Sequence, residues 1–321
     1  MEIAFLTPLP EPDGGGSAFN AGLVPALRAQ GHQVTVTDRL AEAPHGVPIV
    51  DGMLLPRLEN EIEALLARDA VAVVHHVSAA AGRDMTARNA VGECERRMLP
   101  RLRRVVTTSR PVAERLAAQF GVAAPLLLQP GLPDLPRSTG SAAGCAILCV
   151  GVLTPRKGHD RLLTALARLT DLDWSLTVAG DAGRDPVHAD TLAAQVEALG
   201  LQNRVTLLRN PAQEELQPLW AGADLFATAT GWEGYPAALA EAMRRGIPIV
   251  APDLPGIEAL VPPGAGVLHK PDDLATFGKC LRRVIFDHAL RTELADGAWQ
   301  AGAVLPGWDE QARTFVSILK G

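Results

Sequence analysis

The stretch LFATATGWEGYPAALAEAMRRGIPIV, residues 225–250, decides the fold because it encodes a strand, a loop, a helix and a second strand. A short apolar run opens the stretch and another closes it, as expected for two buried strands. Pro236 suits the first turn of a helix, and Gly246 ends that helix. Glu233 therefore lies in the loop before the helix, and Glu241 lies about one turn inside it. Such a strand–helix–strand unit builds a parallel sheet.

The same alternation of short apolar runs and helical segments continues along the whole chain. Candidate strands are Ile3–Thr7, Val34–Thr37, Val71–His75, Val105–Thr108, Leu126–Leu128, Ala146–Gly151, Ser175–Ala179, Val205–Leu208, Leu225–Ala227 and Ile247–Ala251. Candidate helices between them include Ser17–Gln30, Leu58–Arg68, Met85–Leu99, Pro111–Gln119, Asp160–Leu169, Asp190–Leu199 and Ala237–Arg245. This order predicts an α/β protein with parallel sheets and helices on both faces.

One segment interrupts the pattern. Residues 129–144, QPGLPDLPRSTGSAAG, are rich in Pro, Gly and Ser and predict a linker. Since 321 residues exceed what one core usually serves, we expect two Rossmann-like, doubly wound domains, residues 1–136 and 137–305. Residues 306–321 form a closing helix that we expect to pack back on the first domain. Ligands are expected at the carboxyl ends of the strands, in a cleft between facing domains.

The net charge, the first residues and the cysteines indicate which kinds of protein this chain resembles. The net charge of -6 disfavours a nucleic-acid partner. The opening MEIAFLTPLP fits neither a signal peptide nor a membrane span, so a cytoplasmic protein is expected. The four cysteines, Cys94, Cys145, Cys149 and Cys280, show no metal-ligand spacing, and we expect neither disulfides nor a metal site.

A local excess of positive charge stands out in the first half. Residues 83–115 hold nine arginines and four acidic residues. A solvated surface explains such a run, and a surface for an anionic acceptor or a membrane is the alternative.

Two groups of charged residues indicate phosphate chemistry. The N-terminus of the helix after Glu233 offers free N–H groups and a favourable dipole to a phosphate. Glu233 and Glu241 can then hold hydroxyl groups on either side of that phosphate. Arg156 and Lys157, in GVLTPRKG, follow another buried strand and can neutralise a diphosphate. For an isolated Arg-Lys pair, a charged surface turn is the alternative.

Three further motifs give weaker signals. The glycine run at residues 14–16 lets the backbone approach a phosphate or sugar. His75 and His76 end the buried strand VAVVHH, where either a structural or a functional histidine fits. Asp171 and Asp173 imitate a metal-binding DXD, but they lie in a turn before a strand, away from the expected site.

Together these residues resemble the glycosyltransferases of family 4, which have the GT-B fold. The resemblance covers nearly the whole chain and includes the motifs GHQV, VVHH, RRVVTTS, LLLQPG, VGVLTPRKG, VAGD, EGYPAALAEAMRRGIPIVAPDLPGIEALV and PGWDEQARTFVSIL. The spacing E-x7-E with an upstream Arg-Lys pair is its specific feature. This chain departs from the family pattern at Val152, where many relatives have arginine, and at Pro236, where many have glycine.

The resemblance implies a role for each matching residue. Arg156 and Lys157 bind the diphosphate of a nucleotide sugar, Glu241 binds the ribose and Glu233 binds the donor sugar. The implied donor-binding set is Gly15, Gly16, Gly151, Arg156, Lys157, Glu233, Gly234, Tyr235, Ala237, Ala238 and Glu241. The implied catalytic set is His75, His76, Arg156, Lys157 and Glu233. The family's functional histidine is the second of H-x-H, so the pair here leaves open which histidine acts.

The expected activity is transfer of a hexose from a nucleoside diphosphate sugar, with UDP-sugars favoured, to an acceptor hydroxyl with retention. A soluble small-molecule acceptor is expected, because the first domain lacks a wide apolar helix face and its segment between Asp38 and Met53 is compressed. The alternatives are a lipid or cell-envelope glycan acceptor, a silent nucleotide-sugar binding module, and a UDP-sugar 2-epimerase. No cofactor is expected beyond the nucleotide sugar.

Overall fold

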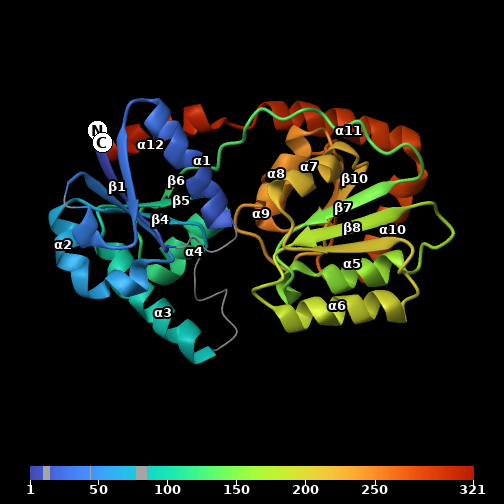
Figure 1. The fold of residues 1–321 in the computed structure, drawn as a ribbon, viewed down its shortest axis with the longest axis horizontal. Helices are drawn as coiled ribbons and strands as arrows, with labels where there is room; N and C mark the ends of the chain where they lie inside the picture. The colour runs from blue at the N-terminus through green and yellow to red at the C-terminus, as the bar shows by residue number, and fades with distance from the viewer. Residues whose placement is uncertain (10–14, 44, 77–84) are drawn as a thin grey trace. The chain divides into compact units, whose positions relative to one another are not determined.

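The computed structural model describes residues 1–9, 15–43, 45–76 and 85–321, without the side chains of residues 15–17 and 85–88. This part of the chain divides into two compact units (Figure 1). Unit 1 comprises Met1–Pro133 and Pro306–Gly321, and unit 2 comprises Asp134–Leu305.

Unit 1 is built on a parallel six-stranded sheet with the order β2-β1-β3-β4-β5-β6. Its strands are β1 (Glu2–Leu6), β2 (Gln33–Thr37), β3 (Val47–Asp51), β4 (Val71–Val74), β5 (Arg104–Thr107) and β6 (Leu126–Leu127). Its α-helices are α1 (Gly15–Ala29), α2 (Ile62–Ala67), α3 (Met85–Met98), α4 (Arg110–Phe120) and α12 (Trp308–Lys320), with 3-10 turns η1 (Leu40–Glu42), η2 (Leu55–Glu61) and η4 (Leu99–Arg101).

The segment between Asp38 and Met53 holds a strand that is not among the candidate strands. This segment holds η1 and β3, and β3 pairs with both β1 and β4 in the middle of the sheet. Pro48 weakens the strand signal in the sequence, because proline lacks the N–H that a central strand normally donates. The strand is nevertheless buried from Pro48 to Asp51.

The C-terminal helix α12 belongs to unit 1. A Cβ on Gly22 of α1 would lie 2.0 Å from the Trp308 ring, so the two helices approach closely at this glycine. The Phe19 and Trp308 rings meet edge to face with centroids 5.5 Å apart. Phe315 and Leu319 join the core formed by β1, β3, β4 and α1.

Unit 2 has a second parallel six-stranded sheet, with the order β12-β11-β10-β7-β8-β9. Its strands are β7 (Ala146–Val150), β8 (Ser175–Gly180), β9 (Val205–Arg209), β10 (Leu225–Ala227), β11 (Ile249–Pro252) and β12 (Gly266–His269). Its helices are η5 (Pro155–Lys157), α5 (His159–Leu166), α6 (Pro186–Ala198), α7 (Gln213–Ala221), α8 (Ala237–Arg244), α9 (Pro255–Glu258), α10 (Leu274–Phe286) and α11 (His288–Ala303). The strand order reverses between β10 and β7.

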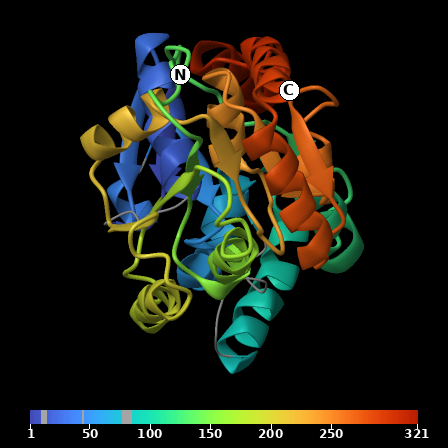
Figure 2. The same ribbon diagram turned by 90° about the vertical axis from the view of Figure 1, so that its right-hand side faces the viewer.

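The helices cover both faces of this sheet. Residues of α5, α6 and α10 share one buried cluster, while α8 packs against α11 (Figure 2). From residue 134 onward, the segment predicted as a linker is part of unit 2. Ser138 N–H donates to the Arg245 carbonyl and Thr139 N–H donates to the Ala221 carbonyl, so the unit boundary falls at Pro133.

Candidate functional site

The two cations predicted to bind a diphosphate lie in the short turn η5 after β7. Gly158 ends this turn with a φ of 68°, a left-handed conformation that favours glycine. A Cβ on Gly158 would lie 2.1 Å from the Ala229 carbonyl oxygen. The turn therefore packs directly on the loop that follows β10.

Hydrogen bonds hold η5 against this loop, and we call the contacts between residues 156–158 and 229–233 the clasp. The Gly231 N–H donates to the Arg156 carbonyl at 2.8 Å. The Arg156 Nη1 donates to the Trp232 carbonyl at 2.6 Å, and its guanidinium carbon lies 5.9 Å from the Trp232 ring centroid. The second contact is within cation–π range.

Glu233 lies at the centre of the clasp. Its Oε1 accepts a hydrogen bond from Lys157 Nζ at 2.6 Å, and its Oε2 lies 3.8 Å from Arg156 Nη1. Only 9% of the Glu233 side chain is exposed, and a buried carboxylate requires such charged partners. The structure thus brings three predicted site residues together beside β10 and β7, where the strand order reverses. In open α/β sheets this position is the usual ligand site.

The N-terminus of α8 follows the clasp directly. A Cβ on Gly256 of α9 would lie 2.8 Å from the Gly234 carbonyl oxygen, so α9 supports this part of the loop. The Ala237 N–H donates to the Tyr235 carbonyl and the Leu239 N–H donates to the Pro236 carbonyl, both at 3.0 Å, whereas the Ala238 N–H between them has no backbone acceptor in the described chain. Burial raises the pKa of Tyr235 to about 12, and its hydroxyl has no hydrogen-bond partner in the described chain.

Glu241 is one turn inside α8, as predicted, and has a partner that the sequence reading missed. Its Oε1 accepts hydrogen bonds from Arg245 at 3.0 and 3.2 Å. Arg245 is fully buried and also donates to Gln217 of α7 at 2.9 Å. Burial raises the pKa of Glu241, and the charge of Arg245 opposes that shift. The i,i+4 spacing of Glu241 and Arg245 is a sequence signal that predicts this pair.

Gly151 follows β7 and lies beside the Lys157 stem: a Cβ on Gly151 would lie 3.3 Å from Lys157 Cε. A larger residue there would crowd the lysine. The absence of a side chain at this position therefore gives Lys157 room beside the strand end.

The remaining predicted residues belong to unit 1. Gly15 and Gly16 begin α1, while Gly14 lies outside the described residues. His75 follows β4 and is buried, with its ring centroid 4.8 Å from that of Phe19. His76 is half-buried.

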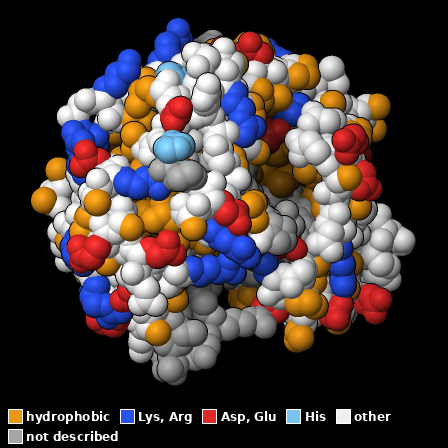
Figure 3. Space-filling model, turned by 60° about the vertical axis from the view of Figure 1, so that its left-hand side comes forward, with side chains coloured by type: hydrophobic (Ala, Val, Ile, Leu, Met, Phe, Trp, Pro, Cys, Tyr) orange, Lys and Arg blue, Asp and Glu red, His pale blue; other side chains and the backbone are white. Residues whose placement is uncertain are grey.

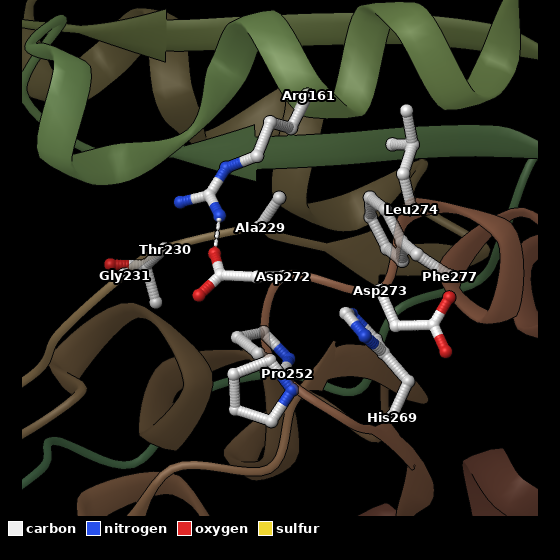
Figure 4. A pocket seen from close by; sticks show the side chains of 11 residues that line it. Arg161, Ala229, Thr230, Gly231, Pro252, His269, Asp272, Asp273, Leu274 and Phe277 are labelled. Carbon is white, nitrogen blue, oxygen red and sulfur yellow. Dashed lines mark hydrogen bonds and ion pairs between the residues drawn. The ribbon is translucent and has the colours of Figure 1, made fainter.

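A small cavity lies on the other side of the loop after β10 (Figure 4). It is bounded by Thr230 and Gly231, by an ion pair between Arg161 and Asp272, and by His269, which points toward it. None of the predicted donor-binding residues lines this cavity. It separates the clasp loop from the β12–α10 turn and carries no assigned role.

Five of the described arginines in the arginine-rich segment have acidic partners. Across elements, Arg97 pairs with Glu59, Arg101 with Glu63 and Arg103 with Asp69. Within α3 and α4, Arg96 pairs with Glu93 and Arg110 with Glu114. Basic and acidic side chains are likewise interspersed on the face seen in Figure 3. These pairs offset much of the local positive charge.

Asp171 of the DXD sequence is held by Arg282 through two hydrogen bonds of 2.8 Å. The described residues contain no group of three or more His, Cys, Asp and Glu side chains placed to hold a metal ion. Within the same residues, no helix combines the length and the apolar character that a bilayer span requires.

Known proteins resemble this chain in sequence. Residues 144–300 match the family model described as glycosyl transferases group 1. A D-inositol 3-phosphate glycosyltransferase from Nocardioides sp. is 31% identical over 188 residues, which are 54% of this chain and 41% of that protein. The GDP-mannose:cellobiosyl-diphosphopolyprenol alpha-mannosyltransferase of Komagataeibacter xylinus is 33% identical over 123 residues, 36% of this chain and 31% of that protein. The chain thus aligns with less than half the length of either relative.

Solved structures match over the full length. Sucrose-phosphate synthase from Thermosynechococcus elongatus superposes with a TM-score of 0.86 at 17% identity, covering 99% of this chain and 98% of that one. Anabaena HepE, in complex with UDP-glucose, gives a TM-score of 0.81 at 18% identity, covering 100% and 99%. The fold is therefore that of the GT-B glycosyltransferases, an α/β fold of two Rossmann-like domains.

Proposed function

We propose that this chain transfers a hexose from a nucleoside diphosphate sugar, with UDP-sugars favoured, to an acceptor hydroxyl, and that the anomeric configuration is retained. The observation that carries the proposal is the clasp. It holds Arg156, Lys157 and Glu233 together at the reversal of strand order, directly before the N-terminus of α8. The family match over residues 144–300 and the UDP-glucose bound by Anabaena HepE support it.

The chemistry requires stabilisation of the leaving diphosphate as negative charge develops on it. Lys157, Arg156 and the first-turn N–H groups of α8 are fixed before the reaction, so they stabilise that charge without reorganisation. Lys157 and Arg156 are shared between the diphosphate and Glu233 when the donor is bound. Glu233 holds sugar hydroxyls, and Glu241, fixed by Arg245, holds the ribose hydroxyls.

Nucleotide binding and sugar transfer can be tested together. Calorimetry with UDP and GDP measures binding, and release of nucleoside diphosphate from UDP-glucose and GDP-mannose measures turnover. We expect UDP to bind more tightly than GDP, and product NMR to show the anomeric configuration of the donor. Binding without release for any donor would favour a silent module, and interconversion of the donor sugar would favour a 2-epimerase. If no nucleoside diphosphate binds, the proposal is wrong.

The proposed acceptor is a soluble small molecule, and a lipid-linked acceptor is the alternative. The K. xylinus relative acts, by its name, on a diphosphopolyprenol-linked sugar. The acidic partners of Arg97, Arg101 and Arg103 favour the soluble acceptor, because they weaken attraction to an anionic surface. Co-sedimentation with vesicles containing anionic lipid distinguishes the two. Tight binding that survives physiological salt would overturn the soluble acceptor.

Transfer is further proposed to be independent of a metal ion, because Arg156, Lys157 and the α8 N-terminus supply the positive charge that a divalent cation supplies elsewhere. We expect turnover to survive excess EDTA. A loss of most turnover in EDTA that magnesium or manganese restores would contradict this prediction.

A further inference from the structure

Arg245, which directly follows α8, carries a permanent charge that is almost completely buried in unit 2. Only 1% of its side chain is exposed. Its guanidinium carbon lies 5.6 Å from the Trp220 ring centroid, and Trp220 in turn stacks on Phe226 of β10 with the two planes inclined by 7°. Trp220 and Phe226 are each 1% exposed. Rigid aromatic rings from α7 and β10 therefore support the guanidinium.

The hydrogen bonds from Arg245 to Glu241 reach only one oxygen of the carboxylate. Arg245 Nε and Nη2 both donate to Glu241 Oε1, at 3.2 and 3.0 Å. An arginine and a carboxylate frequently pair as a fork instead, with one N–H on each oxygen. Two donors occupy the lone pairs of Oε1, and Oε2 accepts no hydrogen bond within the part of the chain that the structure describes. The carboxylate is thus left with one open oxygen.

Contacts on both sides of the chain hold Arg245 in this arrangement. Its Nη2 also donates to Gln217 Oε1 of α7 at 2.9 Å. Its backbone N–H donates to the Glu241 carbonyl at 3.1 Å, and its carbonyl accepts from the Ser138 N–H at 2.8 Å. Because Nη2 is shared between Gln217 and Glu241, the guanidinium cannot turn toward Oε2 without weakening its bond to α7.

The open oxygen of Glu241 calls for a hydrogen-bond donor. The Glu241 side chain is 26% exposed, so it remains accessible to a ligand. Burial raises the pKa of Glu241, and the hydrogen bonds and charge of Arg245 oppose that shift. An ionised carboxylate only accepts hydrogen bonds, and hydroxyl groups donate them. A ribose offers two neighbouring hydroxyls to such an acceptor.

We propose that Arg245 is a positioning residue that makes the nucleotide site selective for ribose. It occupies Glu241 Oε1 and leaves Oε2 as the acceptor for the ribose hydroxyls, while Gln217 holds Arg245 in place. Helix α7 thereby contributes to nucleotide selection through a side chain that does not touch the nucleotide. This inference rests on the proposed function, which assigns the ribose to Glu241.

Calorimetry with UDP and with its dideoxyribose analogue, which lacks both ribose hydroxyls, tests the selectivity. We expect the wild-type chain to bind UDP at least about tenfold more tightly than the analogue, because the analogue leaves the charged acceptor unpaired. Arg245→Met keeps an unbranched side chain and removes the charge. It should lower UDP affinity by at least about fivefold and change the affinity for the analogue by less than about twofold. Equal losses for both ligands would show a merely structural role and overturn the proposal.

Arg244→Met is the matched control for this substitution. Arg244 is the preceding residue, and its guanidinium donates to the Ala303 and Leu305 carbonyls at 3.5 and 2.8 Å. Both contacts lie away from Glu241, so this variant should keep the wild-type preference for UDP over the analogue. A loss of preference as large as in Arg245→Met would contradict the assigned role.

Two further variants test whether Arg245 acts through Glu241. Gln217→Leu removes the α7 acceptor, and we expect it to reduce the preference for UDP by a smaller factor than Arg245→Met does. In the Glu241→Gln background, Arg245→Met should lower UDP affinity by less than about twofold. Independent, multiplying effects would overturn the proposal.

Carbon-13 NMR of the Glu241 carboxyl, assigned by its loss in Glu241→Gln, gives a readout without any ligand. In Arg245→Met we expect its titration to move to higher pH, because burial remains while the opposing charge is lost. UDP affinity of that variant should then fall as the pH drops through the new midpoint. An unmoved titration would overturn the positioning role whatever the chain binds, whereas failure of the wild-type chain to bind UDP or GDP would overturn the proposed function.

Discussion

At the scale of single residues, the site depends on the ion pair between Lys157 and Glu233. Glu233 is mostly buried and its two cations come from η5, with Lys157 lying 76 residues earlier in the chain. Removal of one member of a buried pair leaves the other charge uncompensated, which costs more than the pair itself contributes. A substitution of any of these residues is therefore expected to disturb its neighbour as well as the proposed donor.

Lys157→Ala should lower turnover by at least about tenfold, because the lost charge-assisted contact is worth roughly 1.5–3 kcal/mol. Steady-state kinetics with UDP-glucose checks this. Lys279→Ala is a suitable control, since Lys279 is exposed on α10. Unchanged turnover and UDP affinity in the Lys157 variant would remove that residue from the site.

The two glutamates should separate by role. Glu241→Ala is expected to weaken UDP and UDP-glucose alike, because the proposed function assigns the ribose to Glu241, whose carboxylate is held by Arg245. Glu233→Ala should leave UDP binding nearly intact and impair sugar transfer. Calorimetry of both ligands with both variants measures this, and the reverse assignment would overturn the proposed donor orientation.

Much of the site could be anticipated from residue types and spacing. The E-x7-E spacing and the Arg-Lys pair after a strand predict a shared anionic ligand, and the structure places Arg156, Lys157 and Glu233 in contact. Their direct pairing could not be predicted, because it depends on side-chain conformations across distant segments. The hydrogen bonds that join Asn20 to Asp51 and Thr7 in unit 1 could not be predicted for a similar reason, because they depend on the register of β1 and β3.

At the scale of elements, the position of η5 depends on one glycine. Gly158 has a positive φ and no room for a Cβ, because the Ala229 carbonyl lies in its way. Most of the elements themselves follow from the alternation of short apolar runs and amphipathic segments. The strand β3 does not, since Pro48 interrupts its pattern, and β12 lacks a strong apolar run: its residues 266–268 are only half-buried.

Gly158→Ala should destabilise the protein by roughly 1–3 kcal/mol and impair transfer, because strain and a steric clash both displace η5. Gly200→Ala is a closely matched control. Gly200 has the same φ of 68°, but a Cβ added there would meet no heavy atom within 4 Å. Gly200→Ala should therefore lower the stability through backbone strain alone and leave sugar transfer normal. Equal loss of transfer in both variants, at equal thermal stability, would contradict the role of the clasp.

At the scale of the whole molecule, buried histidines link stability to pH. Burial lowers the pKa of His159 from 6.5 to about 3, with the charge of Lys157 adding to the shift. The unfolded chain therefore binds a proton in a range where the folded chain does not, and stability falls as the pH falls below about 6.5. Burial also lowers the pKa of His75 and of His269, which adds to the same trend.

His159→Gln should flatten this dependence between pH 7 and pH 5, where one such histidine accounts for roughly 2 kcal/mol. Denaturant unfolding at both pH values measures the difference. His288→Gln, at an exposed position, should keep the wild-type dependence. An unchanged difference between the two pH values in His159→Gln would show that other groups cause the acid sensitivity.

Helix α12 follows unit 2 in the sequence but belongs to unit 1, and this affects how the chain folds during synthesis. The residues that complete the unit 1 core, including Phe315 and Leu319, leave the ribosome after every residue of unit 2. Domains generally fold as units during translation. Unit 2 has its full set of strands and helices while unit 1 still exposes the α1 surface around Gly22 and Phe19. The N-terminal unit is therefore the last to close, and a nascent chain stalled before Trp308 should present that apolar surface to chaperones.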